Sequence, residues 1–328
     1  MMLDLHIHSN WSDGVLSPHE IIAKWVDFRA VSITDHNSLR GILSLQHDSG
    51  TLPIVLPGFE TRLMGEPDYL FYLPTNDLVK IKAAEEDLVK IRQGDHLVSR
   101  YIYETHYRLP NFEQELAKVC VSGGLAECLC TSRELAYMIV NCSAMDGLEF
   151  CKALRDVRKW KTKYMKLAWA GKLPAMKEAA DYAAPHYSNP PEWLSRFAQR
   201  HSAVVALAHP WREVKRNFLR DPPGSSKIEM NEAVKWLENL AKRFISTFPG
   251  GAMECSHFDG IHKHFNVDPN VLTDTILSIA RTLSLPVVTG SDTHTAGSEN
   301  FLPRGCDWEG LCKLLPAKIR CWLEANSG

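Results

Sequence analysis

Short apolar runs alternate with amphipathic patterns at both ends of the chain. The first run, from Met2 to Ile7, alternates apolar and polar residues with a period of two, which predicts a strand leading into a loop over 9–14. Further strand-like runs lie at 31–34, 52–59, 69–73, 203–207, 252–255 and 286–289. Runs of this length, separated by helical patterns, are typical of α/β folds.

Helical patterns lie between most of these runs. Ser17, Pro18 and Glu20 have the spacing of a capping box with Pro in the first turn. We therefore expect a helix that begins at Ser17 and whose apolar face extends to Phe28. Other expected helices cover 39–47, 228–246 and 269–283. This alternation favours an α/β barrel, and a chain of 328 residues has room for an insertion in it.

The segment 76–195 differs from the rest because it has no strand-like runs. It contains successive helical patterns, broken by Pro and Gly residues. We interpret it as a helical insertion that covers the mouth of the barrel, between a first barrel part at 1–75 and a second at 196–328. The alternative is that these are the outer helices of the barrel, but so many helices without an intervening strand favour the insertion.

Residues that suit metal ions follow the expected strands. His6 and His8 lie two positions apart, so a strand directs both side chains to the same side, and Asp13 follows on the loop. In α/β barrels the catalytic groups lie at the carboxyl ends of the strands. The full set of candidate metal ligands is His6, His8, Asp13, His36, Glu60, His209, Asp292 and His294.

This set combines imidazoles and carboxylates and contains no thiolate. Such ligands indicate Mn, Fe or Zn in a catalytic site rather than a structural zinc site. They exceed what one tetrahedral ion needs, so we expect two or three divalent ions, with Glu60 as a bridge. Sites with several ions recur in phosphoester hydrolysis, where they generate hydroxide and neutralise charge on oxygen.

Five short motifs resemble the polymerase and histidinol phosphatase (PHP) family in content and in order. They are Asp4-Leu5-His6-Ile7-His8-Ser9 with Ser12-Asp13-Gly14, Thr34-Asp35-His36-Asn37, Gly58-Phe59-Glu60, Ala208-His209-Pro210 and Gly290-Ser291-Asp292-Thr293-His294. The resemblance covers about 1–74 and 200–296. It implies a distorted seven-stranded (β/α) barrel with two or three divalent ions at its mouth. The helical insertion resembles the stand-alone branch that acts on nucleotides and short RNA ends.

The resemblance also implies a role for each ligand. One ion would be held by His6, His8, Glu60 and Asp292. A second would be surrounded by Asp13, His36, His209 and His294, and Glu60 would also touch a third ion. We expect His36 and Asp292 to be catalytic, together with His257, which follows the run at 252–255 and could serve as a proton donor.

One position departs from the family pattern. Family members usually have a histidine shortly after the glutamate of the third strand, and here Asp68 or Tyr69 stands in that place. A neutral phenol is a poor ligand for these ions, since an unperturbed Tyr titrates near ~10. The third ion is then absent, weaker, or completed by Asp68 or a water.

Two arginines are candidates for binding a substrate phosphate. Arg212 lies three residues after His209, where its guanidinium could fork onto a phosphate; the alternative is an ion pair with Glu213 or Asp221. Arg133 resembles the arginine at a helix start in the nucleotide-acting branch.

Composition narrows the function classes. The formal net charge of −2 gives no sign of bulk duplex nucleic-acid binding, although local arginines could hold a small nucleotide. The first residues resemble no signal peptide, and no apolar run approaches the length of a membrane span. Nine scattered cysteines fit buried thiols in a reducing cytoplasm, so we expect a cytoplasmic protein.

The sequence therefore predicts a metal-dependent phosphoesterase. Its substrate would be a nucleoside monophosphate, a nucleoside bisphosphate or a short RNA end, attacked by a metal-bound hydroxide. One alternative is a metal-dependent amidohydrolase, which commonly carries a carboxylated lysine on a middle strand; no Lys lies at the ends of the second to fourth expected strands. Another is a partly degenerate barrel that acts as a binding or regulatory module, but the retained ligands favour an enzyme.

Overall fold

The computed structural model of the chain describes residues 2–9, 11–12, 14, 16–45, 53–62, 67–88, 190–218, 228–256, 261–293 and 313–326. Most of the expected insertion lies outside these ranges, so the insertion and the division at 75 and 195 stay predictions. Within the described ranges, no helix combines the length and the apolar character needed to cross a bilayer.

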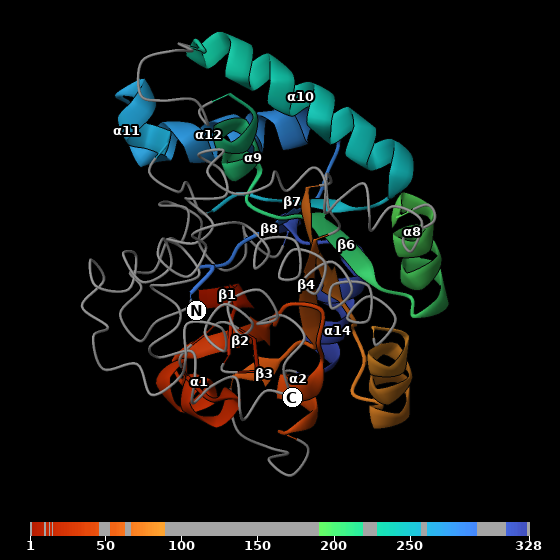
Figure 1. Cartoon of the computed structure of the whole chain (residues 1–328). Coiled ribbons are helices and arrows are strands. Elements are labelled where there is room, and N and C mark those ends of the chain that lie inside the picture. The colour runs from red at the N-terminus through yellow and green to blue at the C-terminus, as the bar shows by residue number, and fades with distance from the viewer. Residues whose placement is uncertain are drawn as a thin grey trace, which may run out of the picture.

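The described strands form two sheets (Figure 1). The first is parallel and has the order β1-β2-β3, with β1 at Met2–Ile7, β2 at Phe28–Ile33 and β3 at Ile54–Val55. The second has the order β4-β5-β6-β7-β8. Its strands are β4 (Gly58–Arg62), β5 (Asp68–Tyr72), β6 (Val204–Leu207), β7 (Ala252–Glu254) and β8 (Val287–Val288). The strand expected over 52–59 is thus divided between β3 and β4.

One strand runs against the others. β5 pairs antiparallel with β4 and with β6, whereas β6, β7 and β8 pair in parallel. The expected uniform strand–helix alternation is therefore corrected at β5. The reversed strand brings its first residue, Asp68, to the edge of the sheet where its neighbours end, because Asp68 pairs with Arg62 and Tyr72 pairs with Gly58.

Hydrogen bonds join the two sheets at two seams. At one seam the Leu5 amide donates to the Thr289 carbonyl and the His8 amide donates to the Thr293 carbonyl, each at 2.9 Å. At the other seam the Glu60 amide donates to the Thr34 carbonyl at 3.1 Å. The described residues thus give a mixed α/β fold with two joined sheets, and no closed barrel is found among them.

Helices lie outside both sheets (Figure 1). α1 (Pro18–Lys24) and α2 (Arg40–Leu43) lie beside the first sheet, and a further helix covers 78–88. The helices α9 (Pro210–Phe218), α10 (Met230–Thr247), α11 (Ile261–Phe265) and α12 (Pro269–Thr282) gather on the side of the second sheet. The remaining two are α8 (Pro190–Arg200) and α14 (Ala317–Ala325).

The expected capping box at Ser17 is present, but the helix is shorter than its apolar pattern predicted. The Glu20 amide donates to the Ser17 hydroxyl and the Ser17 amide donates to the Glu20 carboxylate. The helix ends at Lys24, Val26 is exposed, and Phe28 begins β2. The helix stops there because Trp25 adopts a non-helical conformation, with its indole bound to Asp4.

Two apolar clusters support this arrangement. The smaller one takes side chains from six strands and from α14: it includes Leu3, Leu5, Ala30, Leu70, Tyr72, Val204, Ala206, Ala252, Val288, Ile319 and Leu323. These strands therefore share one interior. The larger cluster packs the helices against the other faces of the strands, and it includes Tyr69 and Phe71 of β5. The alternation along β5 thus directs Tyr69 toward the helices and Leu70 toward the shared interior.

Asp4 connects β1, α1 and the segment after β8. Its buried carboxylate accepts hydrogen bonds from the Ser291 amide at 2.8 Å, the Ser291 hydroxyl at 2.7 Å and the Trp25 indole at 2.9 Å. Burial raises the pKa of Asp4, although these hydrogen bonds act in the opposite direction. This network fixes the backbone immediately before Asp292.

Replacing Asp4 should destabilise the fold. Asp4→Ala leaves the buried Ser291 and Trp25 donors without their acceptor, so we expect a loss of about 3 kcal/mol in the free energy of unfolding. Urea denaturation measures this loss. Asp274→Ala, at an exposed position of α12, is the control and should change stability by less than about 0.5 kcal/mol. Equal stability of the two variants would refute the role of Asp4.

Candidate metal centre

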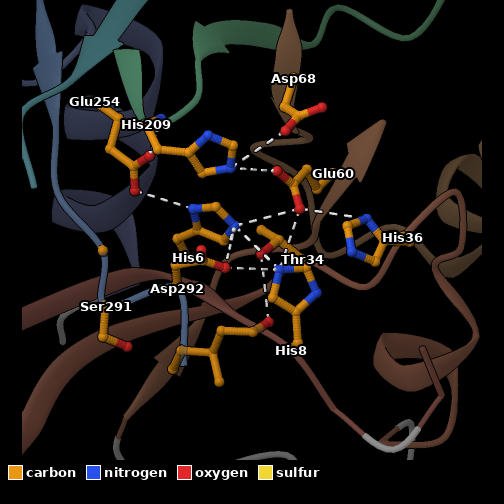
Figure 2. Close-up of polar contacts among 12 residues, drawn as sticks. His6, His8, Thr34, His36, Glu60, Asp68, His209, Glu254, Ser291 and Asp292 are labelled. Carbon is orange, nitrogen blue, oxygen red and sulfur yellow. Dashed lines mark hydrogen bonds and ion pairs between the residues drawn. The ribbon is translucent and has the colours of Figure 1, made fainter. Parts of the chain in front are cut away.

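Four buried side chains converge between the two sheets (Figure 2). His6 and His8 come from the end of β1, Glu60 comes from β4, and Asp292 follows β8. The Nε2 atoms of the two histidines lie 3.1 Å apart. Glu60 Oε2 lies 3.6 Å from His6 Nε2 and 3.2 Å from His8 Nε2, and Asp292 Oδ1 lies 3.4 Å and 3.3 Å from the same two atoms.

These five distances match the edges of a tetrahedron around one ion. Ligand atoms at 2.0–2.1 Å from a tetrahedral ion lie about 3.4 Å from each other. The two facing imidazole nitrogens also require a proton or a cation between them, since two lone pairs at this distance repel. The donor set and its spacing therefore fit a divalent cation. It is also the set that the family resemblance assigns to one ion.

Charge explains why such a group needs a compensating proton or cation. Burial lowers the pKa of His6, but the charges of Glu254, Asp292 and Glu60 outweigh it, so that the pKa lies well above its ordinary value. Burial raises the pKa of Glu60, but His36, His6 and the hydrogen bond from His209 outweigh it, so that this pKa lies well below its ordinary value. The site is thus a buried cluster of carboxylates whose charge a proton or a cation would compensate.

A second group shares Glu60 with the first. His209 Nε2 lies 2.8 Å from Glu60 Oε1 and 3.6 Å from Asp68 Oδ2, and all three side chains are buried. The sequence prediction placed His209 with Asp13, His36 and His294. In the structure His209 faces Asp68, because it follows β6, which pairs directly with β5; Asp13 and His294 lie outside the described residues, so their part of the predicted group stays a prediction. Glu60 directs one oxygen to each group, in the manner of the bridge that the sequence predicted.

Asp68, and not Tyr69, occupies the position where family members usually have a histidine. The Tyr69 ring packs against the C-terminal end of α10, with ring centroids 5.5 Å from Phe248 and 6.3 Å from Phe244. Asp68 faces the site because alternate residues of a strand point to opposite sides. Ligands were expected after the end of each strand. Because β5 is antiparallel to its neighbours, its first residue, Asp68, lies at the site instead of the residue that follows the strand.

The other predicted residues divide into two sets. The His36 ring lies tilted against that of His8 with centroids 4.6 Å apart, and its Nδ1 lies 3.3 Å from Glu60 Oε2, so it borders the first group. Arg212 lies at the rim: its guanidinium is 3.1 Å from His209 Nε2 and 3.5 Å from Asp292 Oδ2. The predicted Asp13, His257, His294 and Arg133 lie outside the described residues.

The sequence analysis missed Glu254. This buried carboxylate accepts a hydrogen bond from His6 Nδ1 at 3.0 Å and another from the His209 amide at 2.5 Å. The first bond keeps the proton on Nδ1 and leaves the Nε2 lone pair for an ion. An acidic residue at the end of an otherwise apolar run, Ala252-Met253-Glu254, is the signal that could have revealed it.

The backbone is unusual at two of the candidate ligands. His209 has φ of 27° and Asp292 has φ of 47°, in the left-handed region that residues other than Gly seldom adopt. Such conformations persist where the surrounding contacts hold them, and they cluster at functional sites. Here the Glu254 carboxylate holds the His209 amide and Asp4 holds the residue before Asp292.

Comparisons with known proteins are few. Neither models of protein families nor curated proteins give a match. Among solved structures, one match is an amidohydrolase from Chromobacterium violaceum with bound sulfate and no metal, with 17% identity, a TM-score of 0.45, and coverage of 99% of this chain and 96% of that one. Another is an inferred metal-dependent phosphoesterase from Bifidobacterium adolescentis, with 17% identity, a TM-score of 0.44, and coverage of 95% and 94%. Likenesses of this size do not identify an activity.

Glu254→Gln should weaken metal binding without removing a ligand. The amide keeps the shape of the side chain but loses the charge that holds the Nδ1 proton of His6. We expect a 10–100-fold loss of Mn²⁺ affinity, as is typical for partners of metal-ligating histidines. Equilibrium dialysis against Mn²⁺ measures it. Glu324→Gln, on the exposed side of α14, should bind like the unchanged protein; an unchanged affinity of the Glu254 variant would contradict the proposed contact.

Metal affinity should rise with pH beyond the range of an ordinary histidine. Because the pKa of His6 lies above its usual 6.5, the metal-free protein keeps this proton at neutral pH, and a cation must displace it. Glu60, with its lowered pKa, is already ionised there. We expect Mn²⁺ affinity to increase up to about tenfold per pH unit between pH 6 and 8. An affinity that levels off at pH 6.5 would show that His6 titrates normally.

Proposed function

We propose that this chain is a metal-dependent phosphoesterase of the PHP type, in which the strands close into a distorted seven-stranded barrel. The observation that carries the proposal is the set of five interligand distances between 3.1 and 3.6 Å among His6, His8, Glu60 and Asp292. The shared interior cluster supports the barrel, since side chains from six strands meet in it.

Two arginines on α9 favour a phosphate ester as the substrate. Arg212 and Arg216 lie one helical turn apart, and both reach carboxylates of the candidate centre. The Arg212 side chain is 27% exposed, so its guanidinium can meet a ligand at the rim while it contacts His209. A planar guanidinium suits the paired oxygens of a phosphate. We therefore assign Arg212 to the binding of the substrate. The ion pair with Glu213, which was the alternative for Arg212, is made by Arg216.

The candidate residues divide the chemistry between them. When bound, divalent cations would activate water for attack on phosphorus and neutralise charge on the ester. His6, His8, Glu60 and Asp292 would hold one cation, and Glu60 would also reach a second one beside Asp68 and His209. Arg212 would stabilise the non-bridging oxygens as charge builds on them. His36 is 34% exposed and lies beside Glu60 Oε2, whereas His209 lies beside Glu60 Oε1, so His36 would face the substrate from the other side of Glu60.

The amide-hydrolysing alternative has less support. It would use a carboxylated lysine on a middle strand, and none of the strands that the structure describes contains a lysine. The proposed substrates are nucleoside monophosphates, nucleoside bisphosphates and short RNA ends, held by Arg212 and by the predicted Arg133. Two or three ions of Mn, Fe or Zn would serve, and a cytoplasmic location remains part of the proposal.

Purified protein with added Mn²⁺ should hydrolyse para-nitrophenyl phosphate or one of the proposed nucleotides. Asp292→Asn should lower turnover more than about 100-fold, beyond the loss expected from an outer partner. Arg212→Gln should lower kcat/KM by about 100-fold, as for removal of one transition-state donor. Release of inorganic phosphate is the measurement.

Lys215→Gln is the matched control, since it removes one positive charge from an exposed position of the same helix. It should keep its activity within about twofold. Turnover that survives Asp292→Asn would refute the proposal. Hydrolysis of N-acyl amino acids by a protein inactive on every phosphate ester would favour the amidohydrolase.

A further inference from the structure

A carboxylate of the second ligand group accepts a hydrogen bond from a guanidinium, whereas the guanidinium nearest the first group, that of Arg212, lies 3.5 Å from Asp292. Arg216 Nη2 donates to Asp68 Oδ2 at 2.7 Å, and its Nη1 donates to Glu213. The Arg216 side chain is only 16% exposed, and the Asp68 side chain is 5% exposed. This pair is therefore a largely buried, charge-assisted contact and not a surface ion pair.

The arginine acts on the oxygen that faces the candidate ligands. Asp68 Oδ2 is the atom that lies 3.6 Å from His209 Nε2, and the same atom accepts the hydrogen bond from Arg216. A cation bound by Glu60, Asp68 and His209 would share this oxygen with a guanidinium and lie next to its fixed positive charge. Like charges at such distances in a buried site repel strongly. The guanidinium cannot relieve this by losing its proton.

Its other neighbours keep Arg216 in place. Burial lowers the pKa of Arg216, but the charges of Asp68 and Glu213 outweigh it, so that the pKa is raised despite the nearby Arg212. Glu213 is itself buried on α9, one turn before Arg216. Since a buried carboxylate needs a partner, Glu213 holds the guanidinium against β5.

We propose that Arg216 makes the two metal positions unequal in affinity. Its guanidinium already compensates the charge of Asp68, so the position at Glu60, Asp68 and His209 binds a divalent ion weakly. The position at His6, His8, Glu60 and Asp292 binds a divalent ion more tightly. The inference rests on the proposed function, because it assumes that the first group holds a metal. On this inference, Arg216 determines how many divalent ions the protein binds at a given metal concentration. The working enzyme at low metal concentration then contains a divalent ion at the first position and a guanidinium beside the second.

The difference between the groups agrees with their contacts. At the first group, Glu254 fixes the Nδ1 proton of His6 and thereby exposes a lone pair to the ion. At the second group, the outer partner of Asp68 is a cation, which withdraws electron density from the ligand oxygen. One outer partner strengthens its ligand, and the other weakens it.

The test is a titration of the metal-free protein with Mn²⁺ alone, with free Mn²⁺ counted by electron paramagnetic resonance. The unchanged protein should show one tight ion and a second that is at least tenfold weaker. Arg216→Gln keeps a hydrogen-bond donor for Asp68 but removes the charge, and it should raise the affinity of the second ion at least tenfold. The first ion should change less than threefold. Arg216→Lys keeps the charge and should leave the second ion weak.

Two further variants separate the contact from a general charge effect. Lys215→Gln, which removes an exposed charge from the same helix, should leave both ions unchanged. In Asp68→Asn, the added Arg216→Gln change should no longer strengthen the second ion, because the coupling acts through Asp68. Thermal unfolding of the metal-free variants identifies any that fail to fold, and Arg216→Met then replaces Arg216→Gln.

The outcomes distinguish the two claims. Two ions of equal affinity in the unchanged protein, or a second ion that Arg216→Gln weakens or leaves unchanged in a folded protein, would overturn the role of Arg216 alone. Failure of the unchanged protein to bind any Mn²⁺ would overturn the proposed function and the inference together. A higher affinity for the second Mn²⁺ in Arg216→Gln, together with an unchanged affinity in Lys215→Gln, supports the inference.

Discussion

The buried carboxylate of Glu60 is the constraint on which the site depends. Its Oε2 atom faces His6, His8 and His36, and its Oε1 atom faces His209. A charge buried to this degree is stable only if positive charge or hydrogen-bond donors surround it. The histidines supply these donors in the metal-free protein, and a cation would supply stronger compensation. The four histidines therefore surround Glu60 whether or not an ion is present, so the ligands are already in place for an ion to bind.

The direction of β5 determines which residues reach this carboxylate. In a uniformly parallel sheet, every residue at the site follows a strand, and the position after the β5 run would face the ligands. Because β5 is antiparallel to both neighbours, its first residue does so instead, and Asp68 meets His209 from the adjacent β6. The same reversal turns Tyr69 toward the helices. A single change of strand direction thus gives the second ligand group a carboxylate.

The periodic pattern of the sequence predicted features that are local, whereas the grouping of Glu60 and Asp292 with the two histidines was expected from the family resemblance. The two-residue spacing of His6 and His8 was enough to place both imidazoles together, and the capping box at Ser17 was found where its spacing indicated. It could not predict features that depend on pairing between distant segments. The reversal of β5, the contact of Glu254 with His6, and the contact of Arg216 with Asp68 all join residues that no local pattern connects. The end of α1 was missed for the same reason, since Trp25 bonds Asp4 across the fold.

The ligands also lie beside the seams between the two sheets, and this gives a cation a structural effect. His6 and His8 belong to the first sheet, while Glu60 and the segment before Asp292 belong to the second. Backbone hydrogen bonds cross the seams at Thr289 and Thr293 on one side and at Thr34 and Asn37 on the other. An ion held by residues from both sheets would add a further connection, and it would stabilise the folded state because it binds to that state alone. Metal binding and folding are then one linked equilibrium, in which the free energy of the site contributes to the free energy of the fold.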